Sequence, residues 1–382
     1  MHTPSLQSPR TPLTGQPVAD SVSSRRPPTP VPPMPKRVTI SDVAARAGVS
    51  TGTVSAVLND RAGVRDTTRA RVRHVMQELG YRPSTSARHL GGLREEAVVQ
   101  PPGVGIVIKE IDNPFYAEVV KGAGQELDAR GYVSLVTTSE GDYEKEGSVI
   151  ESLRNRYTGG VIIAPVLDAH ADLSHLFMLR RSRFPFVLLE TVLGLPANAV
   201  SVDNVEASAL AVRHLLGLGH ERMVHFAGPT YTRHSQDRSL GFERAFSQSP
   251  LQFDPALVVS AGSRFEDGYA AGLDYFRGRG ADRPTAVTCF NDLVALGLIR
   301  ALTDLGLRVP DDVSVVGFDD IPAASYLTTP LTTVHVPQRE LGRRAAAVLV
   351  DAIEDPGAEP QTVLLDAPLV ERATTAPPRG RA

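Results

Sequence analysis

Hydrophobic residues between positions 39 and 79 recur at intervals of three or four, which is the spacing of a buried helix face. The first predicted helix begins after Thr39, which forms the Ser/Thr-x-x-Asp/Glu capping pattern with Asp42, and ends at Gly48. Ser50 has the side chain of an N-cap, so a second helix is expected to begin there. Two short helices joined by a glycine-containing turn are typical of a helix-turn-helix motif.

The segment after this motif contains a third predicted helix and then a much shorter one. The third helix begins at Asp66 or Thr67, presents one apolar face and ends at Gly80. Residues 84–90, STSARHL, could form barely two turns before a pair of glycines. Because so short a helix is unstable by itself in water, we expect residues 84–90 to be helical only in a complex.

A different pattern begins near residue 103, where continuous apolar runs alternate with amphipathic segments. Such strands are typical of parallel sheets that helices cover on both faces. The predicted strands are 104–108, 133–137, 161–164, 186–189, 200–202, 223–227, 258–259, 286–290 and 313–318. The predicted helices include 115–130, 143–155, 204–218, 238–247, 266–277 and 292–305. This total exceeds one sheet, so the sequence predicts two α/β lobes with a ligand cleft between them, beyond the carboxyl ends of the strands.

The composition is that of a globular protein with an unusual N-terminal segment. The 382 residues suffice for two or three domains with substantial cores. No apolar run approaches the roughly 18 residues that a membrane span needs. Residues 1–36 are rich in Pro, Ser and Thr and lack the apolar core of a signal peptide, so we expect them to be disordered. Cys289 is the only cysteine, which fits a reducing compartment. We therefore expect a cytoplasmic protein without a membrane partner.

The net charge of −3 conceals a strong asymmetry along the chain. Residues 36–94 hold eleven Lys and Arg against four Asp and Glu, so this segment carries +7 and the rest of the chain carries −10. A compact basic module attached to an acidic body is the electrostatic pattern of nucleic-acid binding. A solvated charged face without any partner is the alternative interpretation of the charge alone.

Short sequence blocks follow one another in a characteristic order along the chain. The basic module contains TISDVAARAGVSTGTVSAVLN and RARVRHVMQELGYRPSTSARHL. The body contains NPFY, GGVIIAP, VDN, LGHERMVHFAGP, FNDLVALG, VSVVGFDD, PLTTVHVPQRELGRRAA and PLVER. From Val38 to about Pro377, this ordered series resembles the LacI–GalR family of bacterial transcription regulators.

The resemblance implies an all-α helix-turn-helix DNA-binding head with a hinge helix, joined to a two-lobed α/β core similar to periplasmic sugar-binding proteins. The implied segments are a disordered tail (1–36), the head (37–83), the hinge and linker (84–95), the core (96–377) and a disordered end (378–382). The family further implies a homodimeric regulator, expected to be a repressor, that binds a palindromic double-stranded operator and senses a small molecule. No cofactor and no metal are expected, and residues 114–130 are expected near the dimer interface.

The second predicted helix matches the family's recognition helix, which reads base edges in the major groove. Thr51, Gly52 and Ala56 fall at the base-facing positions. Ala56 stands where relatives often carry an Arg that binds guanine, so this head is expected to rely on phosphate contacts, DNA shape and thymine methyl groups. Gly52 either permits a close approach to the groove floor or is merely tolerated in the helix.

Further DNA contacts are expected beside the recognition helix and in the hinge. The expected phosphate contacts are Ser50, Thr53, Ser55, Asn59, Arg69 and Tyr81. Ser50 could instead act only as a cap, and Asn59 only as the end of its helix. Leu90 matches the family's wedge leucine, which enters the minor groove and kinks the DNA, with Ala87 and Arg88 beside it. A flexible linker with an unrelated leucine is the alternative for this segment.

The positions that match the family's ligand-facing residues lie mostly after strands. They are Phe115, Tyr116, Thr232, His234, Gln236, Arg238, Ser263, Asn291, Asp292 and Asp319. Phe115 and Tyr116 could stack on a ring or pack in the core, and Asp292 could bind the ligand, cap the next helix or do both. Residues 232–236 are expected to form a variable loop. Ser263 stands where many sugar-responsive relatives have an aromatic platform, so a sugar-like polyol is expected while purine-like and phosphorylated ligands stay open.

An enzyme and an exported solute-binding protein are the alternative functions. No GxGxxG or Walker pattern follows a predicted strand, no Ser lies in a GxSxG elbow, and the histidines lack metal-ligand spacing with the cysteine. The missing export signal and the basic module oppose a solute-binding protein. DNA binding at two salt concentrations distinguishes these classes, because only a regulator predicts a sequence-selective complex with a steep inverse salt dependence.

Overall fold

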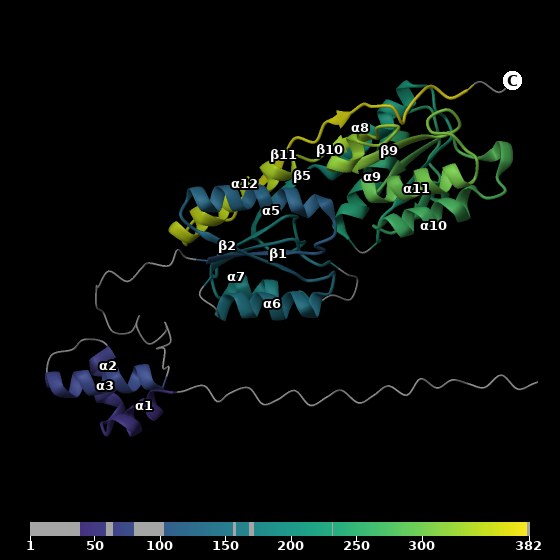
Figure 1. Cartoon of the computed structure of the whole chain (residues 1–382). Helices are drawn as coiled ribbons and strands as arrows, with labels where there is room; N and C mark the ends of the chain where they lie inside the picture. Colours follow the sequence, from purple (N-terminus) through teal and green to yellow (C-terminus); the bar gives the residue numbers. More distant parts are fainter. Residues whose placement is uncertain are drawn as a thin grey trace, which may run out of the picture. The chain divides into compact units, whose positions relative to one another are not determined.

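The structure is a computed structural model that describes residues 39–58, 64–79, 103–155, 158–167, 172–230 and 232–379. The chain divides into two compact units, residues 1–99 and 100–382 (Figure 1). We call the described part of the first unit the head and that of the second unit the core. The predicted N-terminal tail lies outside the described residues. So do five predicted DNA contacts, namely Asn59, Tyr81, Ala87, Arg88 and Leu90.

The head consists of three short helices, α1 (Ile40–Ala47), α2 (Thr51–Leu58) and α3 (Asp66–Glu78). The predicted capping box is present, because the Thr39 hydroxyl accepts a hydrogen bond from Asp42 N and the Asp42 carboxylate accepts one from Thr39 N. Gly48 ends α1 with a φ of 66°, in the left-handed region that glycine tolerates. Ser50 Oγ accepts a hydrogen bond from Thr53 N at 3.1 Å, so the predicted cap of α2 is present too.

The N-terminal lobe of the core contains a six-stranded parallel sheet in the order β11-β5-β4-β3-β1-β2. Its strands are β1 (Gly103–Ile108), β2 (Val133–Thr138), β3 (Thr158–Ile163), β4 (Phe186–Leu188), β5 (Asn198–Val202) and β11 (Thr362–Leu365). Helices cover both faces of this sheet, which explains the continuous apolar runs of its central strands (Figure 1). One face packs on α5 (Pro114–Ala129) and α12 (Gln338–Glu354), and the other on α6 (Tyr143–Asn155) and α7 (Ser174–Arg181).

The C-terminal lobe repeats this architecture with the strand order β12-β10-β9-β8-β6-β7, in which only the β10–β12 pairing is antiparallel. Its strands are β6 (Met223–Ala227), β7 (Val258–Ser260), β8 (Ala286–Cys289), β9 (Ser314–Asp319), β10 (Thr332–His335) and β12 (Leu369–Val370). One face packs on α8 (Asn204–Gly217) and α9 (Arg233–Ser247), and the other on α10 (Phe265–Phe276) and α11 (Asp292–Asp304). Three short 3₁₀ helices are η1 (Pro255–Leu257), η2 (Gly280–Asp282) and η3 (Pro322–Ser325).

The chain crosses between the two lobes three times, after β5, after β10 and after β11. Helix α12 therefore packs on α5 of the N-terminal lobe although it directly follows β10 of the C-terminal lobe. These crossings bring the carboxyl ends of both sheets toward one another. Among the described residues, no helix is both long and apolar enough to cross a membrane.

The predicted strands and helices that fall within the described residues are found, with shifted ends and some additions, whereas the predicted short helix at 84–90 lies outside the described residues. Helix α9 begins at Arg233 because the Thr232 hydroxyl accepts a hydrogen bond from Ser235 N, so the expected loop at 232–236 was wrong. Helices α7 and α12 and strands β10 to β12 were not among the predicted elements. The disordered end was placed too early at residue 378, because Arg379 is described and pairs with Asp311 at 2.8 Å.

Candidate functional site

A cavity of about 180 Å³ lies between the two lobes of the core. The N-terminal lobe contributes Lys109, Glu110, Asn113, Phe115, Tyr116, Gly141, Val166 and Leu167. The C-terminal lobe contributes Pro229, Thr232, His234, Arg238, Ser263, Phe290, Asn291 and Asp319. Many of these residues directly follow strands, as Lys109 follows β1 and Phe290 follows β8, so the cavity occupies the position where α/β sheets bind ligands.

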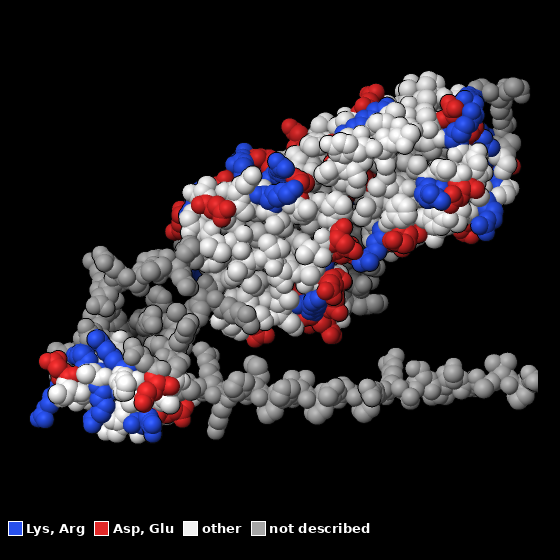
Figure 2. Space-filling view, viewed as in Figure 1, with Lys and Arg blue, Asp and Glu red and all other residues white. Residues whose placement is uncertain are grey.

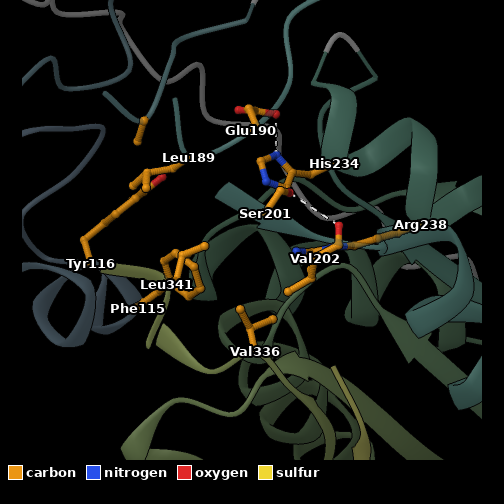
Figure 3. Close-up of a pocket in the computed structure, with 11 residues that line it drawn as sticks. Phe115, Tyr116, Leu189, Glu190, Ser201, Val202, His234, Arg238, Val336 and Leu341 are labelled. Carbon is orange, nitrogen blue, oxygen red and sulfur yellow. Dashed lines mark hydrogen bonds and ion pairs between the residues drawn. The ribbon is translucent and has the colours of Figure 1, made fainter. Parts of the chain in front are cut away.

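A smaller cavity of about 40 Å³ adjoins the first and shares four of its lining residues, Phe115, Tyr116, His234 and Arg238. Most of its remaining wall is apolar, with side chains such as Leu189 and Leu341 (Figure 3). A ligand between the lobes would therefore meet a polar region and an apolar region. Such a combination is typical of small-molecule sites, in which a few polar groups orient a ligand against apolar walls.

Arg238 is held by contacts on several sides within the cavity. It is buried, its Nε donates a hydrogen bond to Asn204 Oδ1 at 2.9 Å, and its Nη1 donates one to Phe290 O. Its guanidinium lies 3.6 Å from the centre of the Phe318 ring and 3.6 Å from Asp319 Oδ1. These contacts hold a planar group with five N–H donors in one orientation, as recognition of hydroxyl or carboxylate oxygens requires.

Asp319 lies at the end of β9, in a backbone conformation that is unusual for a residue with a side chain. Its φ is 110°, and the carbonyl of Asp319 accepts a hydrogen bond from Gln338 Nε2 at the start of α12. Burial raises the pKa of Asp319 to about 7, although the adjacent Arg238 opposes this effect. A strained backbone that other contacts hold in place is a common feature of binding sites.

Three titratable side chains form a chain of contacts beside the two cavities. Lys109 Nζ donates a hydrogen bond to Glu190 Oε1 at 3.1 Å, and His234 Nδ1 lies 2.6 Å from Glu190 Oε2. Figure 3 shows His234 directed toward Glu190. Burial by itself would raise the pKa of Glu190, but His234 and Lys109 outweigh it and lower that pKa to about 2. Glu190 is therefore a carboxylate at neutral pH, and its contact with His234 joins the N-terminal lobe to the C-terminal lobe.

A second ion pair joins the lobes at the rim of the cavity. Glu110 follows β1, Arg264 precedes α10, and Arg264 Nη2 lies 2.6 Å from Glu110 Oε1. The side chain of Arg264 is 53% exposed, so solvent screens this pair much more than it screens the contacts of Glu190. The buried contact is therefore the stronger connection between the lobes.

The outer face of α2 in the head carries the predicted base-facing residues. Val54 and Val57 are buried against the other two helices, because residues three apart share a helix face. Thr51 and Gly52 are exposed and Ala56 is half-buried on the remaining face. A methyl group on residue 52 would meet only Ser50 Oγ, at 3.6 Å, so packing within the head does not require this glycine.

The described candidates for phosphate contact lie on or beside the same surface. Ser50 is exposed, Thr53 and Ser55 are half-buried on α2, and Arg69 is half-buried on α3. The α2 sequence TGTVSAVL contains no charged residue, whereas α3 carries several arginines. In the space-filling view, the described face of the head carries several Lys and Arg groups, with Asp and Glu groups beside them (Figure 2).

Comparisons with known proteins agree with this combination of helical head and two-lobed core. The family described as bacterial regulatory proteins, lacI family, matches residues 39–84, and the periplasmic binding protein-like domain matches residues 212–375. The chain is 32% identical over 335 residues to the HTH-type transcriptional repressor PurR of Photobacterium profundum, which covers 87% of this chain and 97% of that protein. The chain belongs to the LacI family.

Two solved structures extend the likeness to the whole architecture. The complex of the transcriptional regulator CelR with cellobiose has a TM-score of 0.63 and 31% identity, and it covers 88% of this chain and 100% of that one. The lac repressor dimer bound to operator and the anti-inducer ONPF has a TM-score of 0.66 and 28% identity, and it covers 89% of this chain and 100% of that one. This LacI-family protein is therefore a DNA-binding transcription regulator and not an enzyme.

Eight of the ten effector positions expected for this LacI-family protein line the cavity. They are Phe115, Tyr116, Thr232, His234, Arg238, Ser263, Asn291 and Asp319. Gln236 does not line it, because Gln236 lies on the exposed side of α9, where its Nε2 donates a hydrogen bond to Thr230 O at 2.9 Å. His234 lies two residues earlier on the same helix and points into the cavity, as the helical period requires.

Asp292 is the second effector position that does not line the cavity. Its side chain is completely buried, where Oδ1 accepts a hydrogen bond from Thr333 Oγ1 at 2.6 Å and Oδ2 accepts one from Ile321 N at 2.8 Å. Burial raises the pKa of Asp292 well above its usual value. The cap of α11 is Asn291, whose side chain accepts from Val294 N, so Asp292 instead fastens the turn after β9 to β10.

Sequence reasoning missed the buried pair of Lys109 and Glu190. Each follows a predicted strand immediately, since Lys109 comes after residues 104–108 and Glu190 after residues 186–189. A charged residue directly after a buried parallel strand was therefore the available signal. The sequence does not indicate that these two residues, which are 81 positions apart, are paired with each other.

Proposed function

We propose that this LacI-family regulator binds a palindromic operator as a homodimer, and that a neutral, sugar-like effector in the cavity controls the affinity for DNA. The observation that carries the effector proposal is that both lobes contribute side chains to one cavity. A ligand that contacts both lobes binds one lobe arrangement better than another, and this difference is what can alter DNA affinity. The regulator would act in the cytoplasm, where its DNA lies.

The charges of the cavity favour a neutral polyhydroxylated effector. Lys109 already contacts Glu190, Arg238 lies beside Asp319, and Arg264 contacts Glu110, so each cation has a carboxylate partner. A phosphorylated ligand would have to compete with these carboxylates for the cations. Hydroxyl groups can instead donate to the carboxylates and accept from the cations without disturbing the balance of charge. The relative CelR is solved with a sugar, cellobiose, which agrees with this class of ligand.

The surface of the N-terminal lobe supports the proposed dimer. Strand β2 is at the edge of its sheet, and its side chains Val133, Leu135 and Val136 are 42–45% exposed. An exposed apolar edge strand is a site of association unless another surface covers it. We assign a second copy of the chain to this surface, because the similar lac repressor structure is a dimer. Two heads related by twofold symmetry would then require an operator with the same symmetry.

The head supports a recognition mode that depends little on bidentate base contacts. Thr51, Gly52 and Ala56 would face the bases, and none of them can form the paired hydrogen bonds that Arg forms with guanine. The phosphate contacts would come from Ser50, Thr53, Ser55, Asn59, Arg69 and Tyr81. Ala87, Arg88 and Leu90 of the hinge would supply the minor-groove contact.

A selection from random duplex DNA with the full-length protein tests this proposal. We expect a palindromic site whose binding weakens steeply with salt. A panel of neutral sugars, sugar phosphates and nucleobases is then added, and a neutral sugar is expected to change the affinity for the selected site by about 5–150-fold. The ligand effect should be lost in His234→Ala, which alters the cavity, and retained in the matched control Gln236→Ala, which alters the same helix outside it.

Three results would each contradict a separate part of the proposal. A selection that recovers no preferred sequence argues against the regulator itself. A selected site without twofold symmetry argues against the dimer. A response to sugar phosphates or nucleobases, without any response to neutral sugars, argues against the assigned effector class.

A further inference from the structure

Four arginines gather at the carboxyl ends of two helices on one face of the N-terminal lobe. Arg154 lies in the last turn of α6, Arg180 and Arg181 lie in the last turn of α7, and Arg183 follows in the loop before β4. All four side chains are exposed. The guanidinium of Arg154 lies 5.9 Å from the centre of the Phe184 ring, next to Arg183. We call these four residues the arginine cluster.

A surface groove of about 440 Å³ lies beside the arginine cluster. It is lined by Arg180, Arg181, Arg183 and residues that follow α12, among them Asp355 and Glu359. Asp355 already accepts a hydrogen bond from a nearby backbone N–H. Three guanidinium groups line the groove against two carboxylates, so its lining carries a net positive charge although the sequence outside residues 36–94 carries −10.

Carboxylates neutralise many other arginines of the core but not these. Arg308, Arg343 and Arg372, for example, lie 3.2, 2.6 and 2.7 Å from carboxylate oxygens. On the face of the core drawn in Figure 2, most Lys and Arg groups adjoin Asp or Glu groups. Within the described part of the chain, the side chains of the arginine cluster form no ion pair. The cluster can therefore bind an anion from outside without breaking an existing pair.

Helix stability explains only part of this arrangement. Arg180 and Arg181 lie in the last turn of α7 and Arg154 in that of α6, where a positive charge favours the helix dipole. Arg183 lies just beyond α7 and has a φ of 54°, a left-handed conformation that is uncommon for a residue with a side chain. Three of the four arginines thus lie where they also stabilise their own helix, whereas Arg183 lies outside both helices.

The arginine cluster lies at the sheet edge opposite the ligand cavity. Helices α6 and α7 lead into β3 and β4, so their carboxyl ends lie near the amino ends of these parallel strands. Strand β1 begins at Gly103 on the same edge, which is where the chain arriving from the head enters the core. Only residues 80–102 separate the head from this edge, a length that spans at most about 80 Å. DNA held by the head is therefore kept at a high local concentration near the cluster.

We propose that the arginine cluster binds the phosphate backbone of duplex DNA that flanks the operator. This inference rests on the proposed function, because the head must first hold the DNA. The contact requires no particular flanking sequence, since guanidinium groups recognise phosphate oxygens by charge and by paired hydrogen bonds. The core thereby adds affinity for long DNA that the head alone does not supply.

The test compares two DNA probes with the same selected operator, one without flanks and one with about two helical turns (~20 bp) of flank on each side. The triple variant Arg180→Ala, Arg181→Ala, Arg183→Ala is compared with Arg244→Ala, Arg277→Ala, Arg300→Ala, which removes the same charge from exposed sites on the C-terminal lobe. At low salt, the first variant should bind the long probe roughly tenfold more weakly than the wild type. The slope of log affinity against log salt concentration for this probe should be smaller by about 1–3 in the variant. Both variants should bind the short probe like the wild type.

The controls separate this proposal from its alternatives. Replacing the same three arginines by lysine should preserve most of the long-probe affinity, because lysine still pairs with phosphate as a point charge. Equal losses on short and long probes, or no loss on the long probe, would overturn the proposal. A different result would also overturn the proposal: inorganic phosphate raises the melting temperature of the wild type but not of the first variant, while that variant binds both DNA probes like the wild type. Failure of the wild type to bind either probe would instead refute the proposed function.

Discussion

Glu190 is the buried carboxylate that contacts both Lys109 and His234 beside the cavity. It is 3% exposed, accepts a hydrogen bond from Lys109 and contacts His234 of the other lobe. A buried carboxylate without partners would cost several kcal/mol, and the contacts with Lys109 and His234 reverse that cost. The pKa of Glu190, about 2, expresses this reversal as a preference for the charged form. Removing the charge of Glu190 therefore leaves Lys109 as a largely buried cation without a carboxylate.

Glu190→Gln should accordingly lower the free energy of unfolding by about 3 kcal/mol near neutral pH. In the wild type, ionised Glu190 stabilises the fold fully above its unfolded pKa of 4.5, and this contribution is lost as the pH falls toward 2. The difference between the two proteins should therefore persist from neutral pH to about pH 4.5 and shrink as the pH falls from there toward 2. Urea unfolding of both proteins at several pH values measures this difference in unfolding free energy.

Glu140→Gln is the matched control, because Glu140 pairs with Lys145 but is 68% exposed. This variant should change the unfolding free energy by less than about 0.5 kcal/mol at every pH. If Glu190→Gln behaves like this control, the proposed role of Glu190 in stabilising the core is incorrect.

At the scale of elements, the N-terminal lobe depends on the close packing of α5 against α12. A side chain on Gly122 of α5 would collide with the carbonyl oxygen of Arg339, and one on Gly342 of α12 would collide with the carbonyl oxygen of Val119. The two helices thus approach each other through reciprocal glycines. Since α12 follows the second crossing between lobes, this contact also fixes where the chain returns to the N-terminal lobe.

Gly122→Ala should destabilise the protein by about 1–3 kcal/mol or more, because the added methyl group forces the helices apart. Gly124→Ala is the matched control on the same helix, where a methyl group would have only an ordinary contact with Ser134 Oγ at 3.9 Å. The control should be neutral or stabilise the protein by about 0.5–1 kcal/mol, since alanine favours a helix over glycine. Denaturant unfolding measures the free energy of unfolding of both variants. Equal changes in Gly122→Ala and Gly124→Ala would contradict the close packing of α5 against α12.

At the scale of the whole molecule, function depends on two heads acting together on one operator. Two linked heads bind far more tightly than one, because the second contact is intramolecular. The exposed apolar edge of β2 is the surface to which we assign the second copy. Loss of that surface should therefore weaken DNA binding without altering the cavity.

Leu135→Asp should shift the protein from dimer to monomer, since a buried unpaired charge opposes association. Sedimentation at micromolar concentration measures this shift, and affinity for the selected operator should fall by at least tenfold with it. The control Leu193→Asp alters a leucine that is 92% exposed between β4 and β5, and it should leave both measurements unchanged. A fully dimeric Leu135→Asp protein with an unchanged melting temperature would show that β2 is not the interface.

The sequence by itself determined the features that depend on neighbouring residues. The capping box of Thr39 and Asp42, the cap at Ser50 and the apolar strands followed from local spacing and were found in the structure. Most of the cavity residues could be named as well, because parallel strands place the residues that follow them at one edge of a sheet. The start of α9 was missed because Thr232 was assigned to a loop instead of to a cap.

Only the tertiary structure decided which distant residues meet. Lys109 pairs with Glu190 across 81 positions, and Asp292 turns inward because Thr333 and the backbone of Ile321 supply donors in the interior. The sequence left open whether Asp292 binds the ligand, caps the next helix or does both, and its place near the end of a strand does not reveal the inward contacts that the structure shows. Periodicity and capping are properties of a few consecutive residues, whereas the partner of a buried charge depends on how the chain crosses between the lobes. That path is fixed by packing over the whole core, which no local pattern contains.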